Sequence, residues 1–287
     1  MPDEDRIEAM PTKAFFVNML VRDIPLERAV LDLLDNCIDG ARNVRPGDEA
    51  DYAGLFVKIK MNDERFKIED NCGGFDIRQA RYYAFRFGRP DGADSTAYSI
   101  GQFGVGMKRA LFKFGKFFEV KSTTENQHWS MHVDVDDWLS RENEWAFAFD
   151  EISDDREFGA EERGTTIEVR DLRSEVAARF DSEFFKRKLA DMIRSHQRKF
   201  LAQGLAVEFD GRHLTASELS VRAGGDFQPA VEEFIFEPDS AAPVTVRLVV
   251  GVSDPSPLNA GWYVLCNRRV IVAADRWTIQ AGERSRS

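Results

Sequence analysis

The stretch LLDNCIDGA at residues 33–41 decides how this sequence is interpreted. At about 100° per residue, the side chains of Asp32, Asn36 and Asp39 gather on one side of a helical wheel. The apolar residues of the same segment gather on the opposite side. The pattern therefore predicts a strongly amphipathic helix from about Leu26 to Asn43, with acids and an amide along its polar side.

This polar side has two interpretations. Polar helix faces are usually solvated, and an ordinary exposed face would explain the pattern. However, Arg28 is the only cation on this face. An amide oxygen such as that of Asn36 is a hard ligand for Mg²⁺, and a carboxylate one turn earlier, Asp32, can orient and deprotonate a water molecule. The helix by itself leaves both interpretations open.

A second motif, DNCGG at residues 70–74, follows an expected strand at residues 66–69. Asp, Asn and Gly are favoured in ordinary turns for backbone reasons. Alternatively, the Asp70 carboxylate accepts a hydrogen bond from the exocyclic amine of adenine, and the two glycines let the backbone approach the flat ring. Taken alone, this short motif does not choose between a turn and a base-binding site.

A third motif, GQFGVGMK at residues 101–108, precedes an apolar segment that favours a helix. Glycines expose backbone N–H groups, and the N-terminus of a helix attracts phosphate. Lys108 adds a positive charge. The spacing is neither that of a Walker A loop nor that of a Rossmann fingerprint. A flexible surface loop remains the alternative interpretation of this motif taken by itself.

The order of these motifs resembles the GHKL superfamily of ATPases, which includes DNA gyrase B, the large heat-shock chaperones, MutL repair proteins and histidine kinases. Residues 33–41 look like the N-box of that family, and IEDNCGGF at residues 68–75 looks like its DxGxG motif. SIGQFGVGMKRA at residues 99–110 is similar to the phosphate loop of heat-shock chaperones and MORC ATPases. RGTTIEV at residues 163–169 looks like the GT strand.

The resemblance implies a role for each matching residue. Asp32 occupies the general-base position, and Asn36 would coordinate Mg²⁺ on the phosphates of ATP. Asp70 would bind the adenine amine, with Thr165 helping through water, and Gly74 would line the base pocket. The remaining residues expected to bind the nucleotide are Asp39, Gly101, Gln102, Phe103, Gly104, Val105, Gly106 and Lys108.

The resemblance also implies an architecture. We expect an α+β Bergerat fold, with a mixed sheet covered by helices on one face, in residues 1–204. A partial, truncated transducer-like β-rich domain is expected in residues 205–287. Residues 85–100 would form a mobile ATP lid, and bound ATP would promote homodimer formation. In transducer-bearing relatives a second-domain cation reaches the γ-phosphate, and the candidates here are Arg268, Arg269 and Arg276.

Two departures from the family pattern affect the expected activity. The general-base position usually carries Glu, so Asp32 reaches about 1 Å less far, and small misplacements can cost orders of magnitude in rate. Cys72 replaces the first glycine of the DxGxG motif. We therefore expect a Mg²⁺-dependent ATPase with slow hydrolysis, or alternatively an ATP-binding clamp or sensor with little or no turnover. A histidine-kinase-type phosphotransferase is less favoured, because no histidine precedes the N-box helix.

The overall composition limits the partners and the compartment. The formal net charge of -11 argues against non-specific electrostatic binding to nucleic acid or to an anionic membrane. The three cysteines, Cys37, Cys72 and Cys266, are widely spaced, which argues against a disulfide framework and suits a reducing cytosol. The sequence shows neither a signal-peptide pattern nor a membrane span. These features predict a cytoplasmic protein.

The remaining segments are assigned from hydrophobic periodicity and turn residues. Residues 1–22 are expected to form a lead-in arm, and Asp23 is expected to cap the first long helix, with Pro25 in its first turn. Further helices are expected at residues 77–85, 107–114 and 184–203. Strands are expected at residues 55–60, 66–69, 117–122, 129–135, 145–149, 165–169, 205–209, 244–252 and 262–272.

Overall fold

A computed structural model describes most of the chain. The described residues are 11–47, 49–86, 106–141, 144–217, 221–222, 224, 228–237, 243–253, 260–266 and 269–276. The chain divides into two compact units, Met1–Ala216 and Ser217–Ser287.

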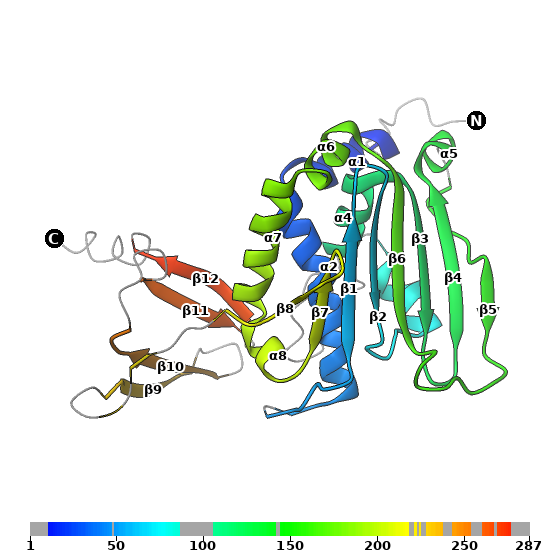
Figure 1. Ribbon diagram of the computed structural model, residues 1–287. Coiled ribbons are helices and arrows are strands. Elements are labelled where there is room, and N and C mark those ends of the chain that lie inside the picture. The colour runs from blue at the N-terminus through cyan, green and yellow to red at the C-terminus, as the bar shows by residue number, and fades with distance from the viewer. Residues whose placement is uncertain are drawn as a thin grey trace. The chain divides into compact units, whose positions relative to one another are not determined.

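The first unit is built on an eight-stranded sheet with the order β5-β4-β3-β6-β2-β1-β7-β8 (Figure 1). Strands β1 and β7 run parallel, and the other neighbours in this sheet are antiparallel. The strands are β1 (Phe56–Met61), β2 (Arg65–Asp70), β3 (Gly115–Thr123), β4 (His128–Asp134), β5 (Glu151–Ser153), β6 (Gly164–Leu172), β7 (Ala206–Phe209) and β8 (Arg212–Leu214).

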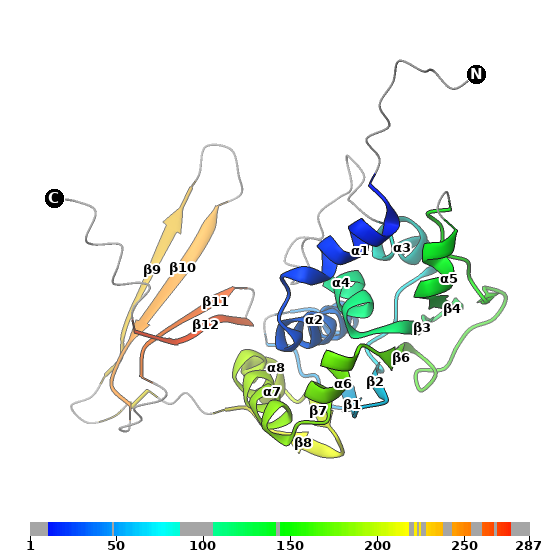
Figure 2. The same cartoon turned by 90° about the horizontal axis from the view of Figure 1, so that it is seen from above.

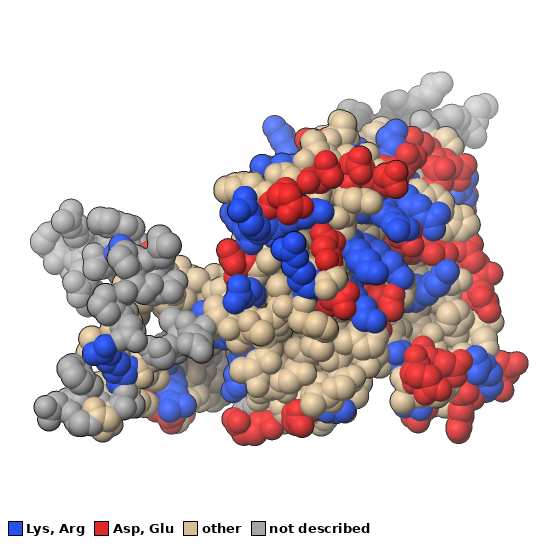
Figure 3. Space-filling view, in the orientation of Figure 1, with Lys and Arg blue, Asp and Glu red and all other residues tan. Residues whose placement is uncertain are grey.

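The two faces of the sheet differ because side chains alternate along each strand. Ile59, Ile68, Ile167 and Val120 are buried and pair in register across β1, β2, β6 and β3. The residues between them form the opposite face, which is largely charged: Lys58, Lys60, Lys67, Glu69, Glu119, Lys121, Glu168 and Glu208. On the side of the molecule seen in Figure 3, Lys and Arg are interspersed with Asp and Glu. The sheet is therefore packed on one face and solvated on the other.

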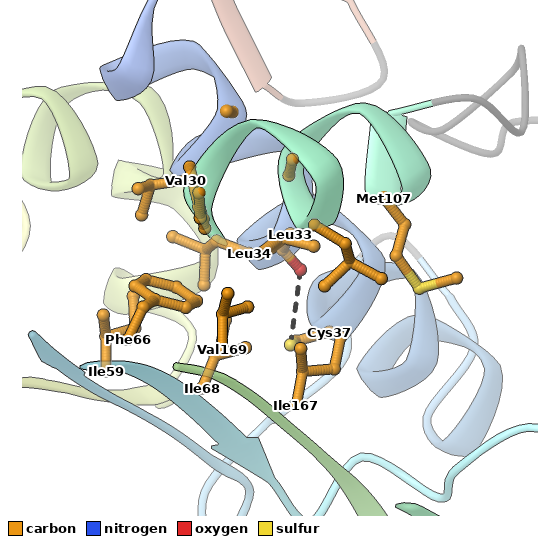
Figure 4. Packing of buried hydrophobic residues seen from close by; sticks show 14 of the residues in the cluster. Val30, Leu33, Leu34, Cys37, Ile59, Phe66, Ile68, Met107, Ile167 and Val169 are labelled. Atoms are coloured by element: carbon orange, nitrogen blue, oxygen red, sulfur yellow. Dashed lines mark hydrogen bonds between the residues drawn. The ribbon is translucent and has the colours of Figure 1, made fainter. Parts of the chain in front are cut away.

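Helices cover the apolar face of this sheet (Figure 2). Val30, Leu33 and Leu34 of α2 lie directly above Ile68 and Val169 of the sheet (Figure 4). Full burial of one such side chain contributes about 1.5–3 kcal/mol. The helices are α1 (Lys13–Arg22), α2 (Leu26–Val44), α3 (Ile77–Gln79), the π-helix η1 (Ala80–Ala84), α4 (Gly106–Phe114), α5 (Val135–Ser140), α6 (Ser174–Phe180), α7 (Glu183–His196) and α8 (Arg198–Ala202).

The α+β prediction and the amphipathic helix α2, which begins at Leu26 as expected, are confirmed, but the predicted cap of α2 by Asp23 is wrong. Pro25 occupies its N-cap position without a side-chain hydrogen bond. Asp23 instead ends α1 as its C-cap residue, because the expected lead-in arm is helical from Lys13. The Thr12 hydroxyl caps α1 by accepting the Phe15 N–H at 3.3 Å.

The predicted strand at residues 145–149 is also wrong. This segment has no strand assignment, and β5 begins after it. The apolar residues alternate in this segment for another reason: Trp145, Phe147 and Phe149 pack against the edge of the core. The ring centroids of Trp145 and Trp138 lie 5.7 Å apart, and those of Phe149 and Trp129 lie 5.6 Å apart.

The single helix predicted at residues 184–203 is interrupted at Gln197, which separates α7 from α8. The Gln197 side-chain amide donates a hydrogen bond to Asp35 Oδ1 of α2 at 2.7 Å, and both residues are buried. A tertiary polar contact thus coincides with the break in the helix. Periodicity does not reveal such a contact.

The first unit extends beyond residue 204, the predicted end of the first domain. Because β7 pairs with β1 and β8 pairs with β7, residues assigned to the second domain belong to the main sheet. The second unit contains two antiparallel hairpins, one of β9 (Ala230–Phe236) and β10 (Val244–Val250) and one of β11 (Trp262–Cys266) and β12 (Arg269–Asp275). The expected strand at residues 262–272 is therefore a hairpin.

Candidate functional site

Asp70, the last residue of β2, is a buried carboxylate. Its Oδ1 accepts the Cys72 N–H at 2.7 Å. Burial raises the pKa of Asp70 to about 6, whereas hydrogen bonds from the Cys72 N–H, the Cys37 thiol and the Thr165 N–H act in the opposite direction. These donors surround a group that, when ionised, can only accept hydrogen bonds. The carboxylate is thus prepared to accept a further donor from a ligand.

The glycine turn after Asp70 brings the backbone close to the end of β3. Gly73 and Gly74 have φ angles of 86° and 65°, a region that glycine adopts readily. A Cβ atom on Gly74 would collide with the carbonyl oxygen of Thr123 and would lie 2.9 Å from the Ser122 hydroxyl. Gly74 was predicted to line a base pocket, and the structure shows a close approach that excludes a side chain at this position.

Ser122 links this turn to β6 and was not singled out from the sequence. Its hydroxyl accepts the Phe75 N–H at 2.8 Å and lies 3.4 Å from Thr165 Oγ1. Thr165 is itself the register partner of Asp70. Ser122 follows Phe118 and Val120 on the inward-facing side of β3. A hydroxyl in this otherwise apolar series was the feature of the sequence that could have marked Ser122 as a site residue.

Asp32 lies at the other end of the site, where α2 meets the first residue of α4. A Cβ atom built on Gly106 would lie 3.2 Å from Asp32 Cβ and 3.3 Å from Asp32 Oδ2. Asp32 Oδ1 is 3.2 Å from Arg28 Nε. The N-terminus of a helix attracts phosphate through its unpaired N–H groups. The absence of a side chain at Gly106 therefore brings a carboxylate next to a position suited to phosphate.

Helix α2 connects the two ends of the site. Asp32 adjoins Gly106, whereas burial and the nearby Asp70 carboxylate raise the pKa of the Cys37 thiol well above its usual value. Five residues along a helix correspond to a rise of about 7.5 Å. Asn36 is exposed between these two positions. Asp39 lies farther along the helix, and its carboxylate is 3.5 Å from the guanidinium of Arg42.

Lys108 lies in the first turn of α4. The Lys108 ammonium is buried and donates to the carbonyl oxygens of Ala84 at 2.9 Å and Arg86 at 2.6 Å. Burial lowers its pKa to about 8. The structure thus places the Lys108 amine at the end of η1, where the expected lid begins. Gly101, Gln102, Phe103, Gly104 and Val105, and nearly all of the expected lid, lie outside the described residues.

The basic candidates in the second unit also differ in their surroundings. Arg268 lies outside the described residues, whereas Arg269 is buried. Arg276 Nε donates to the carbonyl oxygen of Ala260 at 3.0 Å within the same unit. Arg276 is therefore engaged in a local contact.

A mixed sheet covered by helices on one face, with these residues assembled along α2, is consistent with a Bergerat-fold ATPase domain followed by β-rich hairpins. Residues 24–165 match the family model described as Histidine kinase-, DNA gyrase B-, and HSP90-like ATPase. This match supports the assignment of the segment to the GHKL superfamily. A comparison with curated proteins found no match. Among the described residues, no helix combines the length and apolar character that a membrane span requires.

Proposed function

We propose that this protein binds ATP together with Mg²⁺ and hydrolyses it slowly. The observation that carries the proposal is the arrangement along α2. At one end the buried Asp70 carboxylate accepts the Cys72 N–H, and at the other end Asp32 adjoins Gly106 at the start of α4. A ligand with an amine at one end and an anion at the other end matches this arrangement, and ATP has both groups.

The base would be held by the Asp70 end of the site. Adenine carries an exocyclic amine, and the ionised Asp70 carboxylate would accept one of its hydrogens. Gly74 would lie against the ring, because its turn has no side chain to block the approach. Thr165, which lies beside Asp70 and near the Ser122 hydroxyl, would contribute through a water molecule.

The phosphates would occupy the start of α4 and the glycine loop from Gly101 to Gly106. The donor set available there suits Mg²⁺, because the exposed Asn36 offers an amide oxygen, a hard ligand. When bound, Mg²⁺ supplies positive charge that neutralises the phosphate oxygens. Asn36 would hold the ion, and Asp39 would contribute from the next turn of the same helix.

Hydrolysis would use Asp32 to orient and deprotonate the attacking water. Two features favour slow turnover. The aspartate side chain is short for this role, and Arg28 holds one of its oxygens at 3.2 Å, where the guanidinium competes with water. The same features support the alternative function, an ATP-operated clamp or sensor with little or no hydrolysis.

Further parts of the proposal follow from the superfamily. ATP binding would close the segment at residues 85–100 and promote homodimer formation. The second unit would act as the start of a transducer-like domain. The cysteines Cys37, Cys72 and Cys266 are free, which suits a cytoplasmic protein. The resemblance to MORC, MutL and heat-shock chaperones belongs to this proposal as well.

Calorimetric titration tests nucleotide binding directly. ATP and a non-hydrolysable analogue are titrated with and without Mg²⁺ into the wild type and the Asn36→Ala variant, and a matched control is Asp136→Asn, which removes an exposed carboxylate elsewhere. We expect Asn36→Ala to abolish Mg²⁺-dependent binding and the control to bind normally. Unchanged affinity in Asn36→Ala would reject the site.

A phosphate-release assay separates the two functions. Turnover in the wild type that is lost in Asp32→Asn supports the ATPase, whereas tight binding without turnover supports the clamp. Mass measurement with and without ATP tests nucleotide-driven dimer formation.

A further inference from the structure

A cavity of about 310 Å³ lies at the end of the main sheet where β3, β4 and β5 meet the loop that follows β5. Its floor is a row of residues paired across these strands: Thr123 pairs with His128, and His128 pairs with Ser153. Ser122 and Thr123 are consecutive, so their side chains point to opposite faces of the sheet. Because Ser122 lies beside Thr165, the cavity is on the other face of the sheet from the proposed base-binding residues.

The loop between β5 and β6, at residues 154–163, forms the wall of this cavity. Buried Phe158 anchors the loop, because its N–H donates to the Glu125 carbonyl oxygen at 2.8 Å and its carbonyl oxygen accepts from Arg163 Nε at 3.0 Å. The Arg156 guanidinium donates to both carboxylate oxygens of Glu162, at 2.8 and 3.4 Å, and lies 4.0 Å from the centroid of the Phe158 ring. The wall is therefore held by contacts within the loop itself.

Glu151 of β5 supplies the cavity with a carboxylate that can accept from a ligand. Among the described residues this carboxylate makes no hydrogen bond, and its Oε2 lies 3.9 Å from His128 Nε2, beyond hydrogen-bond length. The other ring nitrogen of His128 lies 2.8 Å from the Thr123 hydroxyl. The Ser153 hydroxyl donates to Asp155, so its oxygen can still accept. The cavity thus suits a ligand group with several N–H donors.

The charge around the cavity favours a cation. Residues 150–163 contain seven Asp or Glu residues and two Arg residues. Such a segment attracts positively charged partners and repels phosphate and other anions.

The position of β5 in the sheet favours an extended chain as the partner. Strand β5 is the terminal strand of the sheet (Figure 1). An edge strand presents backbone N–H and C=O groups with which an extended peptide can pair. A partner residue paired with Ser153 would continue the row of Thr123, His128 and Ser153. Its side chain would then lie on the face of the sheet that holds the cavity.

We propose that the cavity binds an arginine side chain of an extended, basic segment of a partner protein, and that this segment pairs with β5. The guanidinium donates to the Glu151 carboxylate and to the Ser153 hydroxyl oxygen. Arginine suits this site because its planar group carries several donors in a fixed arrangement. The proposal does not rest on ATP binding, because none of the predicted nucleotide-binding residues lines the cavity.

The test uses a short fluorescent peptide that alternates Arg and Thr, so that its arginines share one face of a strand. Its binding to the whole protein is measured by fluorescence anisotropy without nucleotide, for the wild type, Glu151→Gln and Glu157→Gln. Glu157 is the matched control, because it is an exposed acid of the same acidic segment but does not line the cavity. A peptide with Glu in place of Arg controls for the sequence, and hydrogen exchange with and without the peptide reports on β5.

We expect the Arg peptide to bind the wild type, more weakly as salt is raised, and to slow hydrogen exchange in β5. Glu151→Gln should weaken binding about tenfold, as expected for the loss of one hydrogen bond to a charged group. Glu157→Gln should change the affinity by less than about twofold. The Glu peptide should not bind.

Several results would overturn the proposal. Equal weakening in the two variants would show non-specific attraction to the acidic segment, and no binding of the Arg peptide would reject the site. Unchanged exchange in β5 would reject pairing with this strand. If acetyl-arginine amide binds as tightly as the peptide, the ligand is a small cation and not an extended segment.

Discussion

Gly40 of α2 is a position where the sequence and the structure predict opposite effects for one substitution. In a helix interior, Gly→Ala normally stabilises by about 1 kcal/mol. Here a Cβ atom would lie 2.7 Å from the Cys72 carbonyl oxygen and 3.2 Å from Cys72 Cβ. The Cys72 turn cannot move freely, because its N–H is bonded to Asp70. Gly40 thus provides the space for the side chain that replaces the first glycine of the motif.

The magnitude follows from two opposing effects. Overpacking of a well-packed site costs about 1–3 kcal/mol. Subtracting the gain of about 1 kcal/mol in helix propensity leaves a net loss of roughly 0–2 kcal/mol for Gly40→Ala. For a chain of this size, each 1 kcal/mol lowers the melting temperature by about 2–4 °C. Because the Cys72 turn holds Asp70, we also expect ATP affinity to fall.

Urea unfolding and calorimetric titration with ATP measure both effects. The matched control is Asn43→Ala, which places alanine at an exposed position of the same helix and should be neutral or slightly stabilising. If the free energy of unfolding of Gly40→Ala rises by about 1 kcal/mol and the variant binds ATP like the wild type, the reasoning is refuted. The Cys72 turn would then have shifted without a loss of stability.

Three further predictions concern buried polar groups. Asp70 has a folded pKa of about 6 against an ordinary 3.8, so the folded state holds its proton more tightly and stability falls as pH rises from about 4 to 6. Relative to Asp70→Asn, the wild type should lose up to roughly 3 kcal/mol over that range, and parallel pH profiles in urea unfolding would contradict this. Lys108→Met should cost about 1–3 kcal/mol and increase hydrogen exchange in η1, because the carbonyls of Ala84 and Arg86 lose their donor; unaltered exchange there would argue against this role. Gln197→Leu removes the amide that binds buried Asp35 and should lower the unfolding free energy by about 1.5–3 kcal/mol, whereas an unaltered denaturation midpoint would show that the contact is dispensable.

Much of the fold was predictable from local pattern. The α2 helix was predicted because its apolar residues recur with helical period, and most strands of the sheet were predicted because their apolar residues alternate. The short strands β5 and β8 were not predicted. The same regularities do not separate a strand from an extended segment whose aromatic rings reach the core, so residues 145–149 were assigned wrongly. Nor does an apolar period show where a buried contact such as that of Gln197 coincides with a helix break.

The motifs by themselves determined which residues were candidates and in what order they occur, because each motif is a short run of chemically distinctive residues. Tertiary structure decided which of them meet. Lys108 was expected at the phosphates, yet its amine binds carbonyl oxygens at the end of η1. Strand β7 joined the main sheet rather than a second domain. These outcomes depend on contacts between segments far apart in the chain, and spacing within one segment does not encode them.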